Sequence, residues 1–134
     1  MRIFLDANIL FSAARSNGAI RQLLQLLQSL GHTLVADDYV IAEAHRNLAS
    51  KESGQAVSDL QTLLGVVEVS AYRSRVPDAD VSWLHPKDQP VLLAAIALGC
   101  DILVTGDKTH FGAGYGTVCG GVTVCSPALL AQRA

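Results

Sequence analysis

Apolar positions in the first part of the chain change from a short run to a helical spacing. Residues 2–5 (RIFL) form a short, largely apolar run that ends at Asp6, which is typical of a buried strand followed by a carboxylate. From Ile20 to Leu30, leucines recur at the spacing of one helical face, and Gly31 stands where such a helix would end. The pattern predicts a strand, a loop and a helix.

The next segment repeats this alternation. Residues 33–36 are predicted to form a second strand, and Asp37 and Asp38 can cap the helix that follows. The apolar stripe of that helix consists of Val40, Ala44 and Leu48. Glu43 lies on the same predicted helix but outside the stripe.

After a break at Ser53 and Gly54, another helix with one apolar face is predicted. Its apolar positions are Val57, Leu60, Leu63 and Leu64. Residues 66–69 follow as a third strand. Residues 71–87 are polar and contain two prolines, so we expect a loop or short helical turns there.

The last third contains the most apolar helix. Asp88 opens it, Pro90 fits its first turn, where the missing amide costs nothing, and Gly99 ends it. Residues 102–104 are predicted to form a buried strand and residues 122–124 a last one. A flexible glycine-containing segment, 112–116, lies between them, and Ser126 and Pro127 start a terminal helical turn.

Strands that alternate with helices predict an α/β protein, a three-layer α/β/α sandwich with a central parallel sheet. We expect one domain over residues 1–134, because 50% of the residues are hydrophobic and the length suits one core. Ligands of such folds collect at the carboxyl ends of the strands.

Composition excludes several classes of protein. The apolar run 91–100 is shorter than the roughly 18 residues of a membrane span, and the N-terminal segment lacks a secretory signal, so we expect a cytoplasmic protein. The cysteines are odd in number and lack the paired spacing of zinc sites: Cys100, Cys119 and Cys125. Reduced thiols are therefore favoured over a redox pair of Cys119 and Cys125.

Carboxylates supply the candidate chemistry. Asp6 and Asp107 each follow a predicted strand, so both should emerge at the rim of the sheet where active sites form. Asp88 starts a helix and has helix capping as its alternative role, while Glu43 has solvent exposure as its alternative. Oxygen ligands of this kind suit Mg²⁺ or Mn²⁺, and the absence of paired His or Cys residues disfavours zinc.

Other polar residues are assigned to structure. Asp101 starts a strand and should point away from the site; Asp37 and Asp38 are predicted caps, and Asp78 and Asp80 belong to a loop. The histidines occupy unrelated contexts: His32, His45, His85 and His110. His110 alone lies close in sequence to a proposed ligand, and packing is favoured over phosphate contact for it.

The formal net charge of −2 argues against nucleic acid as a partner. Setting four cation-neutralised carboxylates aside turns −2 into +2, which weakens this objection. A phosphate track is one interpretation of the dispersed basic residues, and a solvated surface is the other. These residues are Arg15, Arg21, Arg46, Lys51, Arg73, Arg75, Lys87 and Lys108.

Four segments in this order resemble the PIN domain family of metal-dependent ribonucleases, which includes the VapC-type toxins of toxin-antitoxin pairs. The segments are IFLDANIL (3–10), IAEAHRNL (41–48), KDQPVLLAAIALGCDILVTGDKTHF (87–111) and GVTVCSPALL (121–130). They match the family's strand with Asp, helix with one Glu, Asp at the head of an alanine-rich helix, T-x-D, and closing strand with short helix. Each motif is weak alone, but the ordered series covers nearly the whole chain.

The resemblance implies an acidic quartet that binds Mg²⁺ or Mn²⁺ and cuts RNA: Asp6, Glu43, Asp88 and Asp107. It makes Asn8 and Thr105 polar neighbours that orient ligands or water. It further implies products with a 5′ phosphate and a 3′ hydroxyl, an antitoxin partner and a homodimer.

Two alternatives remain open at this point. A metal-dependent phosphatase would carry a second Asp two residues after Asp6, where this chain has Asn8. A non-catalytic PIN-fold module that binds RNA or protein would not need the complete quartet.

Overall fold

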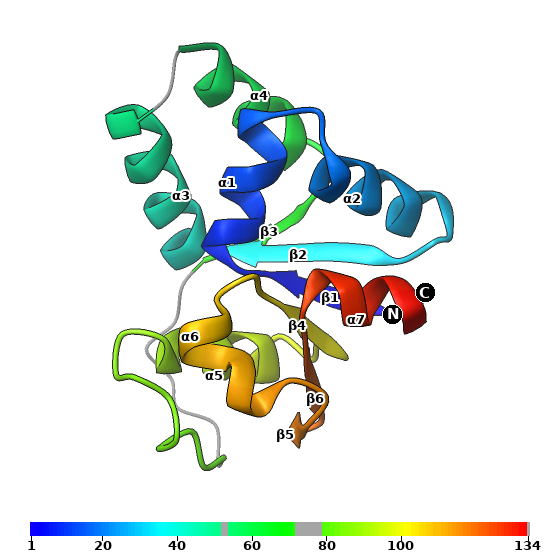
Figure 1. Ribbon diagram of the computed structural model, residues 1–134, viewed down its shortest axis with the longest axis vertical. Helices are drawn as coiled ribbons and strands as arrows, with labels where there is room; N and C mark the ends of the chain where they lie inside the picture. Colours follow the sequence, from blue (N-terminus) through cyan, green and yellow to red (C-terminus); the bar gives the residue numbers. More distant parts are fainter. Residues whose placement is uncertain (52–53, 72–78, 134) are drawn as a thin grey trace.

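The computed structural model describes residues 1–51, 54–71 and 79–133 of the chain (Figure 1). Its strands are β1 (Arg2–Leu5), β2 (Thr33–Asp37), β3 (Glu68–Ser70), β4 (Ile102–Val104), β5 (Val118–Cys119) and β6 (Val122–Cys125). Its helices are α1 (Ala7–Arg15), α2 (Ala19–Ser29), α3 (Asp38–Lys51), α4 (Gly54–Leu64), α5 (Gln89–Ala97), α6 (Lys108–Phe111), η1 (Gly112–Gly114, a 3-10 turn) and α7 (Pro127–Arg133).

The strands form one sheet in the order β3-β2-β1-β4-β6-β5. All neighbouring pairs are parallel except β5 and β6, which form an antiparallel pair at one edge. β1 pairs with β4 in the middle of the sheet, with Leu5 opposite Val104. Residues 6 and 105 therefore leave the sheet side by side, although they are far apart in the sequence.

Helices lie on both sides of this sheet, as the alternating pattern predicts. Figure 1 shows α1 to α4 on one side and α5 with α6 on the other. Ile3, Phe4 and Leu5 of β1 are completely buried, and the predicted stripe of α3 is buried as well. Burial of both faces explains why the central strands are continuous apolar runs instead of alternating ones. The three-layer α/β/α architecture is confirmed.

The structure corrects four local predictions. Residues 7–15 form helix α1 and not a loop; their buried positions recur at helical spacing, as Ala7, Leu10 and Ala14 illustrate. β3 begins at Glu68, two residues after the predicted start, because Val66 and Val67 bond back to the end of α4. The edge strand β5 was not predicted, and residues 112–114 form a 3-10 turn within the segment predicted to be flexible.

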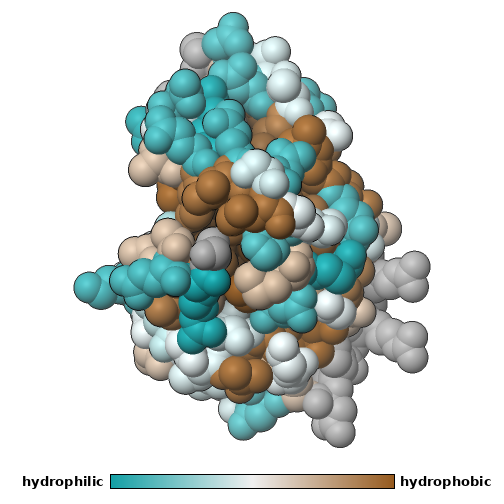
Figure 2. Space-filling view, turned by 90° about the vertical axis from the view of Figure 1, so that its right-hand side faces the viewer, coloured by the Kyte–Doolittle hydropathy of each residue, from teal (hydrophilic) through white to brown (hydrophobic). Residues whose placement is uncertain are grey.

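The surface carries one notable apolar region. Figure 2 shows hydrophobic residues gathered near the middle of the face that lies to the right in Figure 1. Leu26 and Leu30, at the end of α2, are about half exposed.

None of the helices in the described part of the chain has the length and apolar character needed to span a membrane. The three cysteines are free thiols, as expected.

Candidate metal centre

Asp6 occupies the junction between the central strand and the first helix. Its side chain is 5% exposed, and its Oδ1 accepts a hydrogen bond from the amide of Ala7 at 2.7 Å, so that it caps α1. The backbone amide of Asp6 also donates to the carbonyl of Val104 at 3.1 Å. The carboxylate is therefore fixed by the sheet on one side and by the helix start on the other.

Two polar neighbours hold the other oxygen of Asp6. Thr105, which follows β4 and is completely buried, donates its hydroxyl to Asp6 Oδ2 at 2.8 Å. The side-chain Nδ2 of Asn8 donates to the same oxygen at 3.2 Å, and Asn8 Oδ1 accepts from the backbone amide of Gly106 at 2.8 Å. Asn8 and Thr105 thus join the ends of β1 and β4 beside the carboxylate.

Burial also changes the acidity of Asp6. Loss of water around the carboxylate raises its pKa from 3.8 to about 6, and the hydrogen bonds from Thr105 and Ala7 offset part of this effect. The negative charges of Glu43 and Asp88 raise the pKa further. Near neutral pH, the protein therefore keeps an ionised carboxylate where the ionised form is costly.

Asp88 precedes α5 and is 6% exposed. Its side chain makes no capping hydrogen bond within the described structure, so the capping alternative is wrong. Pro90 occupies the first turn of the helix, where it offers no amide to a cap. Asp88 Oδ2 is one of the buried side-chain atoms that have no hydrogen-bond partner among the described residues. No hydrogen bond from the described residues therefore holds this oxygen, although His110 Nδ1 lies 2.8 Å from it.

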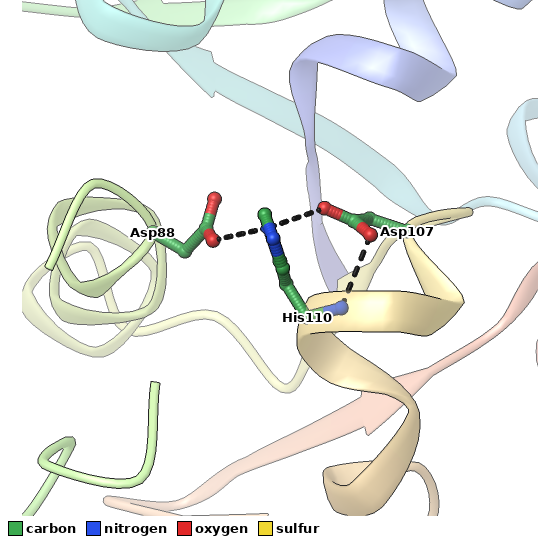
Figure 3. Close-up of side chains that lie close together, drawn as sticks. All are labelled: Asp88, Asp107 and His110. Carbon is green, nitrogen blue, oxygen red and sulfur yellow. Dashed lines mark hydrogen bonds and ion pairs between the residues drawn. The ribbon is translucent and has the colours of Figure 1, made fainter. Parts of the chain in front are cut away.

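Asp107 and His110 lie on one turn of α6. Asp107 Oδ1 accepts a hydrogen bond from the amide of His110 at 3.1 Å, which caps this short helix. The imidazole turns back, and its Nδ1 lies 3.0 Å from Asp107 Oδ2 and 2.8 Å from Asp88 Oδ2 (Figure 3). The ring also stacks on His85, with centroids 5.5 Å apart. The expectation that the histidines occupy unrelated contexts is wrong for this pair.

A cleft of about 440 Å³ connects the carboxylates of Asp6, Asp88 and Asp107. Its polar lining is Asp6, Asn8, Ser12, Glu43, Asn47, Lys87, Asp88 and Asp107. Glu43 reaches it from α3 with 29% of its side chain exposed, and Lys87 Nζ lies 3.9 Å from Glu43 Oε1. The four carboxylates of the predicted quartet therefore line one cleft, and Thr105 supports it from beneath.

The carboxylates assigned to structure lie elsewhere. Asp101 accepts a hydrogen bond from the amide of Arg2 at the opposite ends of the strands, and Asp37 Oδ1 accepts from the amide of Val40 as an N-cap. Burial raises the pKa of Asp37 as well. Asp80 is exposed and bonds to Ser82 within its loop. Asp78 lies outside the described residues.

The described basic residues have different surroundings. Lys87 lines the cleft, whereas Arg21 bonds to the carbonyls of Ala13 and Ala14 and to Asp59. Arg15, Arg46 and Lys108 are exposed. Arg73, Arg75 and the side chain of Lys51 lie outside the described part.

Sequence reasoning did not identify His110 as a neighbour of Asp88 and Asp107. The available signal was its position three residues after Asp107, which places both side chains on one side of a helical turn. No sequence signal identified Asp88 as its neighbour, because that contact depends on how α5 and α6 pack.

The donor set fits a hard divalent cation. Four carboxylates line one cleft with Lys87 as its basic lining residue, and an oxygen of Asp88 lacks a hydrogen-bond donor in the described structure. Such crowding costs energy through repulsion and desolvation unless a cation offsets it. Asp6, Glu43, Asp88 and Asp107 are the residues that could hold such an ion.

Comparison with known proteins agrees with this architecture. Residues 2–109 match the model of the PIN domain family. No curated protein sequence matches the chain. The match covers every strand that contributes to the candidate site.

Solved structures share the fold at low sequence identity. VapBC2 from Rickettsia felis, bound to a DNA fragment from its promoter, aligns with a TM-score of 0.67 and 18% identity over 94% of this chain and 98% of that one. The DNA-bound VapBC of Salmonella typhimurium gives 0.63 and 16% over 95% and 98%. VapC20 of Mycobacterium tuberculosis, a sarcin-ricin loop cleaving toxin, gives 0.59 and 15% over 87% and 98%. The family match and the common fold lead to one conclusion: this chain belongs to the PIN domain family.

Proposed function

We propose that the protein is an endoribonuclease that requires Mg²⁺ or Mn²⁺ and uses Asp6, Glu43, Asp88 and Asp107 as its acidic quartet. The observation that carries this proposal is the convergence of these carboxylates, from four separate parts of the chain, on one cleft. A purely structural role would not require Asp88 to be buried without a hydrogen-bond donor to its Oδ2 in the described structure.

A divalent cation bound in the cleft would activate a water molecule and offset the charge that develops on the scissile phosphate. The protein's own part is to fix the carboxylates. Asp6, which lines the cleft, is held by Thr105 and Asn8, so its carboxylate keeps one orientation. Lys87 at the rim is a candidate contact for the phosphate backbone, since its amine is largely exposed.

RNA is the proposed substrate, and its identity and cleavage sequence stay open in this proposal. Support comes from the family and from the structural neighbour that cleaves the sarcin-ricin loop. A phosphatase would need a nucleophilic Asp followed by a second one two residues later, and Asn8 instead bonds to the backbone of Gly106. The cytoplasmic location predicted from the sequence is compatible with action on RNA and forms part of this proposal.

A protein partner forms part of the proposal. Two structural neighbours are VapBC complexes, so we propose an antitoxin that covers the acidic cleft. The half-exposed leucines of α2 offer an apolar surface for such a partner or for a second copy of the chain. The homodimer and the assignment of residues 1–134 to one domain stay predictions.

The decisive experiment is a cleavage assay on structured and unstructured RNA with Mg²⁺, with Mn²⁺ and with a chelator. Asp6→Asn should lose cleavage by about three orders of magnitude while circular dichroism shows an intact fold. Asp101→Asn is the matched control, because this carboxylate lies at the opposite ends of the strands and should leave cleavage unchanged.

Equal cleavage by wild type and Asp6→Asn would contradict the proposal. Binding of divalent metal without cleavage of RNA would favour the non-catalytic alternative.

A further inference from the structure

We infer that His110 is a metal ligand through Nδ1, so that the centre offers a mixed nitrogen and oxygen face in place of carboxylates alone. This inference rests on the proposed function and concerns which metals the same site prefers. Asp88, Asp107 and His110 each offer one ligand atom, and these atoms all lie within 4.8 Å of one another.

The distances between these atoms match the edges of a coordination polyhedron. Nδ1 of His110 lies 2.8 Å from Asp88 Oδ2 and 3.0 Å from Asp107 Oδ2. In octahedral coordination with bonds of about 2.1 Å, neighbouring ligand atoms lie about 3 Å apart. His110 Nδ1 is thus spaced from each of the two carboxylate oxygens as one ligand atom is from the next around a single ion.

The contacts also lack the direction of hydrogen bonds. Although both oxygens are close, His110 Nδ1 and Asp88 Oδ2 are buried atoms without a hydrogen-bond partner in the described part of the molecule. A ligand atom aims its lone pair at the ion, about 45° away from each neighbouring ligand of an octahedron. Neighbouring metal ligands are therefore close together without pointing at each other. A hydrogen-bonded ion pair at the same distance would instead need the N–H group to point at the oxygen.

His85 holds the imidazole in place. The two rings are nearly parallel, with 12° between their planes (Figure 3 shows the His110 ring between the carboxylates). His85 Nδ1 accepts a hydrogen bond from the amide of Lys87 at 3.2 Å, which ties the stack to the segment that leads into Asp88. Packing against a fixed ring leaves His110 with fewer orientations away from Asp88 and Asp107.

An imidazole ligand changes the expected metal preference. Carboxylates alone suit Mg²⁺, whereas nitrogen donors raise the affinity for transition metals relative to Mg²⁺. The centre should therefore bind Mn²⁺ or Co²⁺ more tightly than Mg²⁺, and His110 should be the cause of a large part of the difference.

The test uses the full chain, freed of metal and then loaded with Mn²⁺ alone. Pulsed electron paramagnetic resonance should detect a directly bound nitrogen in wild type and in His45→Ala, a control at an exposed position of α3. His110→Asn places an amide oxygen near the position of Nδ1, so it should bind Mn²⁺ without the nitrogen signal. Calorimetry should show its ratio of Mn²⁺ to Mg²⁺ affinity lowered by about tenfold.

Two results would overturn the inference: no nitrogen signal in Mn²⁺-loaded wild type, or the same signal in His110→Asn. His110→Ala should lose the signal as well, and the Asn variant decides the matter if the Ala variant does not fold. Binding of Mn²⁺ without a nitrogen signal would leave the proposed nuclease intact, whereas wild type that binds no divalent cation would refute both.

Discussion

Acidic side chains lie at both ends of the parallel strands, and the two ends treat them differently. At the amino ends, Arg2 contacts Glu68 at 2.6 Å, and its amide donates to Asp101 at 2.8 Å. At the carboxyl ends, the described donors to the Asp6 carboxylate are all neutral, and Asp88 Oδ2 lies 2.8 Å from His110 Nδ1 without a hydrogen bond in the described structure. At the amino ends an arginine contacts two carboxylates, whereas at the carboxyl ends four carboxylates share one cleft with Lys87 as its basic lining residue.

This difference teaches how to separate stabilising charges from functional ones. A paired carboxylate lowers the energy of the fold by itself, whereas a buried unpaired one raises it. Substitutions at the two ends should therefore act in opposite directions on stability and should differ on activity.

The largest effect is expected for Asp88→Asn. Cleavage of RNA should fall by about a thousandfold, because the variant loses a charged ligand of the proposed metal. The metal-free variant should nevertheless be more stable than wild type by about 1 kcal/mol, since repulsion with Asp6 is removed. Urea denaturation in the presence of chelator measures this. A less stable variant would show that Asp88 serves the fold.

A smaller effect is expected from pH. The pKa of Asp6 is about 6 in the folded protein, and its ordinary value, which applies to the unfolded chain, is 3.8. Between pH 3.8 and 6, the folded protein therefore keeps a proton on Asp6 that the unfolded chain has already released. This contribution to stability is complete below about pH 4 and is lost as the pH rises through about 6. It amounts to at most about 3 kcal/mol.

Urea denaturation of metal-free protein between pH 4 and 7 measures this loss as the difference between wild type and Asp6→Asn, which cannot titrate. Added Mn²⁺ should reverse the trend, because the ion requires the ionised carboxylate and its affinity rises with pH. Identical pH profiles of both proteins in chelator would contradict the assigned pKa of Asp6.

The smallest effect is expected for Glu68→Gln at the amino ends. Both partners of the Arg2 pair are substantially exposed, so water screens their attraction. A slight decrease in the melting temperature is expected, with metal binding and cleavage unchanged. A change in metal affinity would mean that the two ends of the strands are coupled.

The sequence predicted well what depends on pattern along the chain. Apolar runs located β1 and β4, and the rule that carboxyl ends of parallel strands gather ligands placed Asp6 and Asp107 at one rim. It failed where a pattern had a second interpretation. Residues 7–15, predicted to form a loop, form helix α1, in which Ala7, Leu10 and Ala14 are buried in the core.

The remaining features depend on contacts between distant segments. Asp88 at a helix start was compatible with capping, and only the direction of its side chain removes that alternative. The position of His110 between two carboxylates follows from the packing of α5 near α6. Such contacts leave no periodic trace in one sequence, so they could not be predicted from it.

The pairing of β1 with β4 has a consequence for synthesis of the chain. Asp6 is synthesised before Thr105, which fixes its carboxylate and is separated from it by 99 positions. A nascent chain still attached to the ribosome cannot complete the acidic cleft until β4 and the loop after it have emerged. Loop closure over this span favours late assembly, so a translation product that ends before Thr105 would lack the contact that fixes Asp6.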